Sequence, residues 1–155
     1  MIPEFEKLRD DEVEILLKAP AYVSVLIAGA DDNIDKSEIQ KAIQLAKVKQ
    51  QKARESLLGY YKAVGERFEN DFMTMIEELP HKAAERGPAI NRELKKLNLI
   101  LPKLNKTFST EFYASLKDIA KKIAESSGGI LGYLSVSYEE AKLMELTMIN
   151  DPAKK

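Results

Sequence analysis

Apolar side chains recur every three or four residues along this chain, and that spacing restricts the fold more than any other feature. Few runs show the strict alternation of a half-buried strand, whereas a period near 3.6 residues is typical of a helix with one buried face. We therefore expect an all-α fold, a helical bundle of about six to seven helices. The clearest series predicts one amphipathic helix that ends before Pro80; its members are Leu58, Tyr61, Val64, Phe68, Phe72, Ile76 and Leu79.

Two helices are expected before the first acidic turn. The acidic start and apolar edge of residues 10–18 predict the first, and Pro20 either ends it or starts the next. Residues 20–30 carry no charged side chain, as expected of a central helix surrounded by others. At about a dozen residues this stretch is much shorter than the ~20 that a bilayer-spanning helix needs. No transmembrane segment is therefore expected.

Start signals mark the remaining helices. Asp35 is expected to cap the next one, with Glu38 in the capping-box position and Ile34 before the cap. Later helices are expected to begin at Pro88, Ser109 and Ser137. Their buried faces are expected to include Ile90, Leu94, Leu97, Leu101, Leu104, Phe108, Phe112, Ile119 and Ile123.

The size of the chain suits one hydrophobic core. It has 155 residues, of which 45% are apolar and 32% charged, and we expect a single domain spanning residues 1–155. There is no cysteine, which excludes disulfides and thiolate metal sites and favours a cytoplasmic location. The first residues include Glu4 and Glu6 and do not resemble a signal peptide.

The charges are unevenly distributed along the chain. Residues 1–40 hold ten acidic and four basic side chains, whereas residues 92–122 hold eight basic and three acidic ones. These segments can pair within the fold, pair across a homo-oligomer or contact a protein partner, and we favour pairing within the fold. The pI near 6.0 and the lack of a nucleic-acid motif argue against DNA or RNA as a partner.

Nothing in the sequence points to an enzyme. His81 is the single histidine, so neither a Ser-His-Asp triad nor a histidine-based zinc site can form within one chain, and we expect His81 in a surface loop. No P-loop, nucleophile elbow or dinucleotide motif occurs, and no small-molecule substrate is indicated. A hydrolase using Asp31 and Asp35 is the least favoured hypothesis. Aromatic residues at helical spacing are expected in the core rather than in a ligand site: Tyr60, Tyr61, Phe68 and Phe72.

An acidic turn provides the candidate binding site. Its oxygen ligands suit calcium, magnesium or manganese and come from Asp31, Asp32, Asn33, Asp35 and Glu38. An EF-hand is rejected, because Lys36 stands where its glycine is required and Ala42 where its closing glutamate is required. The alternative is that Asp35 and Glu38 only cap a helix while Asp31 and Asp32 solvate the turn.

Residues 27–38, with Ala30, Asp31, Ile34 and Glu38 in order, resemble the turn of TerB-like domains. These small helical bacterial domains occur in tellurite-resistance-type proteins and in DjlA-type co-chaperones. Asn33 stands where the family often has glycine. The resemblance implies a non-catalytic helical binding module, divalent-cation binding by the acidic turn, and a role in stress-related or envelope-associated assemblies. Residues 123–140 repeat the same order of helix, turn and capped helix.

Overall fold

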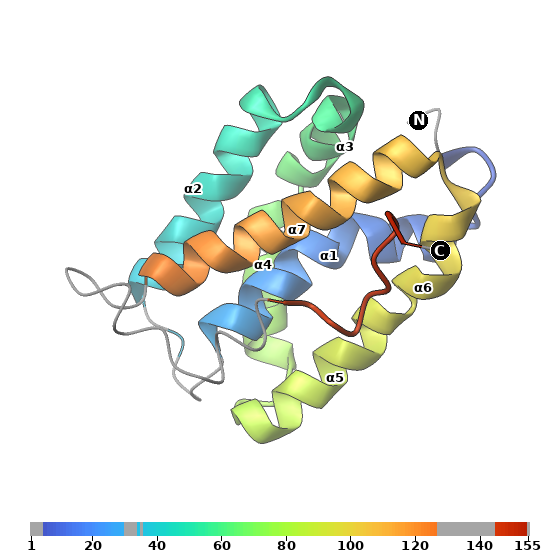
Figure 1. Cartoon of the computed structure of the whole chain (residues 1–155). Coiled ribbons are helices and arrows are strands. Elements are labelled where there is room, and N and C mark those ends of the chain that lie inside the picture. Colours follow the sequence, from blue (N-terminus) through green and yellow to red (C-terminus); the bar gives the residue numbers. More distant parts are fainter. Residues whose placement is uncertain (1–4, 30–33, 35, 127–144, 155) are drawn as a thin grey trace.

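Every regular element in the described part of the chain is a helix (Figure 1). The computed structural model describes residues 5–29, 34, 36–126 and 145–154. Its elements are α1 (Asp10–Ala28), α2 (Lys36–Lys52), α3 (Glu55–Gly65), α4 (Phe68–Glu78), α5 (Ala83–Lys95), α6 (Leu97–Ile100), the 3₁₀ helix η2 (Leu101–Lys103) and α7 (Lys106–Ser126). The expected all-α bundle is confirmed.

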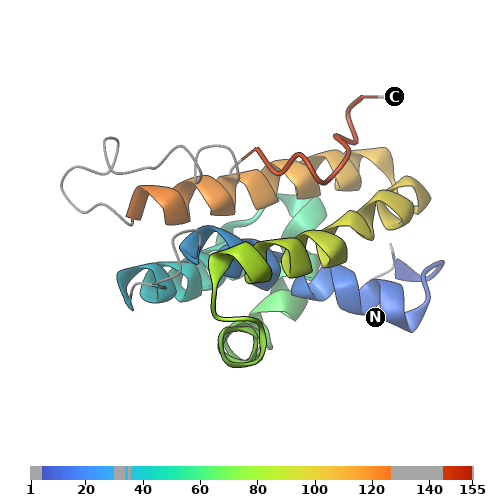
Figure 2. The same ribbon diagram turned by 90° about the horizontal axis from the view of Figure 1, so that it is seen from below.

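Helix α1 lies at the centre of the bundle and packs against α3, α4, α5 and α7. Figure 2 shows α7 on one side of α1 and α4, seen end-on, on the other. The second half of α1 is buried from Val23 to Ala28, as expected for the uncharged stretch. No helix in the described ranges combines the length and hydropathy needed to cross a bilayer.

Helix α1 continues through Pro20, although the sequence predicted a break there. Proline has no N–H, so it cannot donate to the carbonyl four residues earlier, that of Leu16. The hydroxyl of Tyr60 on α3 donates to this oxygen instead, at 2.5 Å. Burial raises the pKa of Tyr60 well above its ordinary value and keeps the hydroxyl protonated as a donor. A tertiary contact therefore replaces the missing helical hydrogen bond.

The single long helix predicted by the series from Leu58 to Leu79 is wrong, because the chain turns at Glu66 and Arg67 between α3 and α4. The two halves have different neighbours: α3 packs mainly on α2, and α4 packs mainly on α1. A Cβ at Gly65 would lie 2.4 Å from the Gln50 amide oxygen on α2, so glycine permits this close approach. Arg67 then pairs with Glu14 on α1 and donates to Asp71 on α4, at 2.7 Å.

Two predicted helix starts are also wrong. Helix α5 begins at Ala83, so Pro88 lies inside it; the carbonyl that Pro88 leaves without a donor belongs to the exposed Ala84, where water can replace it. Helix α7 begins at Lys106 rather than at Ser109. The Asn105 side-chain oxygen caps it by accepting from the backbone N–H groups of Thr107 and Phe108, at 2.8 and 3.3 Å.

The helix expected after Ser137, and with it the second half of the repeat, lies outside the described residues. The predicted buried faces are confirmed: Ile90, Leu94, Leu97, Leu101, Leu104, Phe108, Phe112, Ile119 and Ile123 are all in the core. Tyr60, Tyr61, Phe68 and Phe72 are buried as well. Tyr60 packs edge-on against Phe5, Phe108 and Phe112. The residue that donates a hydrogen bond to α1 is therefore also part of the aromatic core.

Replacing Tyr60 with Phe tests this contact. The free energy of unfolding should fall by about 1–3 kcal/mol, because the buried Leu16 carbonyl loses its donor. Urea unfolding followed by circular dichroism measures the change. The matched control is Tyr22→Phe, at a half-buried position on α1. A loss for Tyr60→Phe no larger than that of the control would contradict the assignment.

Candidate functional site

The structure places one of the five predicted site residues. Glu38 lies in the first turn of α2, with 3% of its surface exposed. Asp31, Asp32, Asn33 and Asp35 lie outside the described residues. Among the described residues, no group of three or more His, Cys, Asp or Glu side chains is placed to hold a metal ion. His81 is exposed between α4 and α5, as predicted.

Arg86 on α5 is a buried cation next to the start of the acidic turn. Its guanidinium donates to the carbonyl of Gly29 at 2.7 Å, and to those of Pro80 and His81 at 3.2 and 2.9 Å. Gly29 is the residue after α1, and a Cβ there would lie 2.3 Å from the guanidinium. Since arginine does not lose its charge, a fixed positive charge lies at the carbonyl of Gly29, the last described residue before the acidic turn in the sequence.

A groove of about 570 Å³ runs between the end of α2, the start of α3, and α7; we call it the α2–α7 groove. Buried Leu45 and Leu57 contribute to its floor, and Val48 on α2 is 45% exposed. Four cations and two carboxylates share its walls: Lys49, Lys52, Arg54, Lys122, Glu111 and Asp118. The walls of this groove therefore carry excess positive charge over an apolar base.

Ion pairs connect the two walls of this groove. Lys49 on α2 and Lys122 on α7 each lie 3.1 Å from the Asp118 carboxylate, and Arg54 lies 3.8 Å from Glu111. Partial burial pushes the pKa of Asp118 upward, but hydrogen bonds from both lysines outweigh it and hold that pKa below its ordinary value. Asp118 is thus an ionised anchor for two of the four cations.

Hydroxyl groups at the base of the groove are engaged in structure. Tyr61 and Ser115 form a hydrogen bond of 2.5 Å with each other, and the Lys49 ammonium lies 5.6 Å from the centre of the Tyr61 ring. Burial raises the pKa of Tyr61 far above neutrality. These groups position Lys49 and α7 rather than supply a reactive oxygen at neutral pH.

The acidic and basic segments of the sequence do meet inside the fold. Lys103 in η2 donates to Glu12 on α1 at 2.7 Å, and the other Glu12 oxygen accepts from the backbone N–H of Arg9 at 3.0 Å. These hydrogen bonds, that from Arg9 first, lower the pKa of Glu12. Several lysines of the basic segment remain exposed: Lys95, Lys96, Lys106, Lys121 and Lys122. Internal pairing therefore accounts for part of the charge asymmetry.

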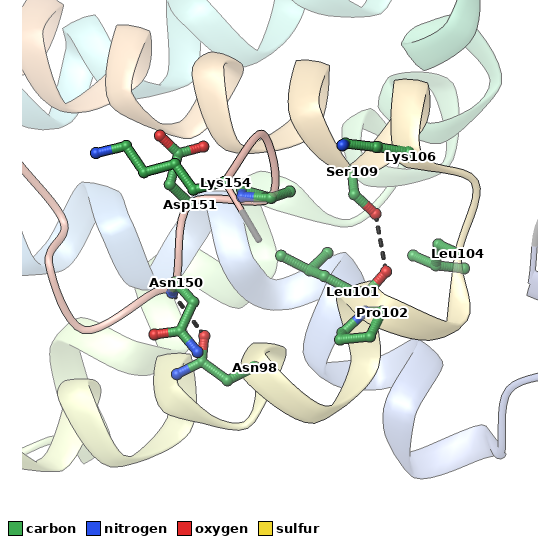
Figure 3. Close-up of a pocket in the computed structure, with 10 residues that line it drawn as sticks. Asn98, Leu101, Pro102, Leu104, Lys106, Ser109, Asn150, Asp151 and Lys154 are labelled. Atoms are coloured by element: carbon green, nitrogen blue, oxygen red, sulfur yellow. Dashed lines mark hydrogen bonds between the residues drawn. The ribbon is translucent and has the colours of Figure 1, made fainter.

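A second cavity, of about 410 Å³, lies between α6, η2, the start of α7 and the described C-terminal residues (Figure 3). Asn98 on α6 lies at the edge of this cavity, and both the nitrogen and the oxygen of its carboxamide form hydrogen bonds. The side-chain nitrogen donates to the Met148 carbonyl at 3.0 Å, and the side-chain oxygen accepts from the Asn150 N–H at 2.7 Å. Ser109 donates to the Leu101 carbonyl at 3.0 Å, where η2 meets α7. The cavity is thus bounded by a segment held through its backbone.

Comparison with models of known protein families, with curated proteins and with solved structures found no match. Function is therefore inferred from the chemistry of the acidic turn and the two cavities. Sequence reasoning missed Arg86, whose partners include the carbonyl of Gly29, 57 residues away in the chain. It also missed Asn98, although a polar side chain within the apolar run of residues 97–101 is a recognisable signal.

Lowering the pH should weaken the contacts of the α2–α7 groove. Because the folded-state pKa of Asp118 is depressed, its stabilisation is complete above the ordinary aspartate pKa of about 3.9 and is lost as the pH falls through the folded value. Asp118→Asn should therefore have a lower free energy of unfolding than the parent protein at pH 7. The difference between the two should become smaller below about pH 3.9. Urea unfolding at a series of pH values measures this gap.

The control for this measurement is the Lys49→Met, Lys122→Met background, in which Asp118→Asn should lose most of its effect because its partners are gone. A gap between Asp118→Asn and the parent that is independent of pH would contradict the ion-pair assignment.

Proposed function

We propose that the chain is a non-catalytic helical binding module whose α2–α7 groove receives an acidic, amphipathic segment of a protein partner. The observation that supports this most is the combination of an apolar floor, with Val48 exposed, and walls that carry four cations against two carboxylates. Apolar contact with a polar, charged rim is the usual composition of a protein-binding surface.

The arrangement of the charges favours an acidic partner. Asp118 is shared by Lys49 and Lys122, so one carboxylate serves two cations. Arg54 is mostly exposed and lies at 3.8 Å from Glu111, and Lys52 is exposed at the same end of α2. Carboxylates of a partner can pair with Lys52 and Arg54 without removing a buried internal contact, so the exchange has a low cost.

Two synthetic helical peptides test this proposal. Both carry the same leucines on one face, and their polar positions are all glutamate in one peptide and all lysine in the other. Isothermal titration calorimetry should show binding of the glutamate peptide at low salt and weaker binding of the lysine peptide, by at least ~10-fold. In the double variant Lys52→Glu, Arg54→Glu, the preference for the glutamate peptide should be reduced or reversed.

The matched control is Arg92→Glu, Lys95→Glu, which makes the same change of net charge at exposed positions on α5 and should keep the preference. Equal affinity for both peptides, or an equal effect of the control, would contradict the proposal. If the acidic partner is a second copy of this chain, sedimentation at low salt should show self-association that high salt reverses.

A second candidate function is divalent-cation binding by the acidic turn. It is supported by the buried Glu38 carboxylate at the start of α2, close in sequence to Asp31, Asp32, Asn33 and Asp35. The resemblance to TerB-like domains leads us to propose also that this module acts in a stress-related or envelope-associated assembly. The positively charged Arg86 guanidinium lies at Gly29, just before the turn in the sequence. We therefore expect the affinity for calcium, magnesium or manganese to be low.

Calorimetric titration with each of the three cations tests the second candidate. The expected result is heat of binding for at least one cation, abolished in Asp31→Asn, Asp32→Asn. The matched control is Asp10→Asn, Asp11→Asn, which removes two exposed carboxylates from the start of α1 and should leave binding intact. Absence of heat with all three cations would rule out this candidate.

A further inference from the structure

The outward face of α5, α6 and η2 carries cations and no exposed carboxylate from position 88 to position 103. Its fully exposed residues are Pro88, Arg92, Lys95, Lys96, Leu99, Pro102 and Lys103. We call those from Arg92 to Lys103 the basic ridge. Figure 1 shows α5 and α6 on the side of the bundle away from α2, so the basic ridge is a different surface from the α2–α7 groove.

Helical spacing places these side chains along one line. The three helical segments continue one another, because Lys96 and Leu101 at the two junctions keep right-handed helical backbone angles. The ridge residues recur every three or four positions, the spacing of neighbours on one helix face. The inner face is buried and consists of Ile90, Leu94, Leu97, Ile100 and Leu101. The basic ridge is thus an outer helix face, roughly 17 Å long at 1.5 Å per residue.

Internal ion pairs leave much of the positive charge of the ridge available. No residue in the described part of the chain forms an ion pair or a side-chain hydrogen bond with Arg92 or Lys95. Lys96 pairs with Glu93 at 3.0 Å, and Lys103 pairs with Glu12 at 2.7 Å. Exposed pairs such as that of Lys96 contribute little and exchange readily with other partners. The ridge can therefore contact a row of anionic groups.

Leu99 indicates which anionic surface this is. It lies between Lys95 and Lys103 on the ridge, and 76% of its surface is exposed, compared with 45% for Val48 and 40% for Met73. Nucleic-acid phosphates would pair with the cations but offer no apolar environment to a leucine. An anionic bilayer offers both, because lipid phosphates lie directly above the acyl chains. The long apolar stems of lysine and arginine also suit this boundary.

We propose that the basic ridge docks on an anionic lipid bilayer. Helices α5 and α6 lie along the bilayer surface, Leu99 enters the layer below the headgroups, and the ridge cations contact lipid phosphates. Each cation near such a surface strengthens binding by roughly 5-fold. Because the whole chain has a net charge of −1, the attraction comes from the ridge rather than from overall charge. Four cations and one leucine give a reversible, salt-sensitive association.

Sedimentation of the full chain with vesicles tests the proposal. Vesicles of equal parts phosphatidylserine and phosphatidylcholine should bind the chain at low salt, and vesicles of phosphatidylcholine alone should not. Arg92→Glu, Lys95→Glu should lower the affinity for the anionic vesicles at least ~10-fold. The matched control is Lys52→Glu, Arg54→Glu, which makes the same change of net charge in the α2–α7 groove and should keep the affinity. Circular dichroism confirms that each variant is folded.

Fluorescence tests the insertion of Leu99. The chain contains no tryptophan, so in Leu99→Trp the indole signal comes from the ridge alone. Its emission should shift to the blue on addition of the anionic vesicles and should be quenched by brominated acyl chains. Val48→Trp places the same fluorophore at an exposed apolar position on α2 and should show neither change.

Three results would overturn the proposal: no binding to anionic vesicles, equal losses for the two charge-reversal variants, or no difference in emission between the two tryptophan variants. Selective loss at the ridge together with a blue shift at position 99 supports it. The two charge-reversal variants exchange roles between this experiment and the peptide titration. Failure of lipid docking is therefore distinguishable from failure of the acidic partner proposed for the α2–α7 groove.

Discussion

The hydrogen bond from Tyr60 to the Leu16 carbonyl is the contact on which the arrangement of the bundle depends. Pro20 removes a donor from the middle of α1, in a region where water does not reach the backbone. Tyr60 supplies the replacement from α3, and its ring packs against aromatic residues of the N-terminal segment and α7. One side chain thus completes the central helix and fixes α3 and α7 relative to it.

Both cavities are consequences of that arrangement. Helix α7 crosses α1; the α2–α7 groove lies on one side of α7, and the cavity between α6, η2 and the C-terminal residues lies on the other (Figure 1). Charge dominates the first groove, where Asp118 ties Lys49 and Lys122 together. Backbone recognition by Asn98 dominates the second. The first surface is the one we propose for an acidic amphipathic segment, whereas the second contacts a turn of the chain itself.

Sequence periodicity predicted which faces are buried, because burial of a helical stripe is a property of local spacing; Ile90, Phe112 and Ile123 are examples. Periodicity failed to predict where helices end, because contacts with groups far away in the chain determine those positions. Pro20 lies inside a helix because Tyr60 satisfies the freed carbonyl, and the strongest apolar series is divided at Gly65 because α3 and α4 pack on different helices. Near the acidic turn, the helix start predicted at Asp35 agrees with α2, which begins at Lys36 and has Glu38 in its first turn. Arg86 was missed because its contact with Gly29 joins positions 57 residues apart in the chain. Asn98 was missed although it is a polar residue within an apolar run.

A double-mutant cycle between Pro20→Ala and Tyr60→Phe tests the dependence of α1 on Tyr60 most directly. Alanine at position 20 restores an N–H that can donate to the Leu16 carbonyl, so the tyrosine hydroxyl is no longer the sole donor. The account predicts that Tyr60→Phe lowers the free energy of unfolding less than half as much in the Pro20→Ala background as in the parent protein. An equal loss in both backgrounds would contradict it.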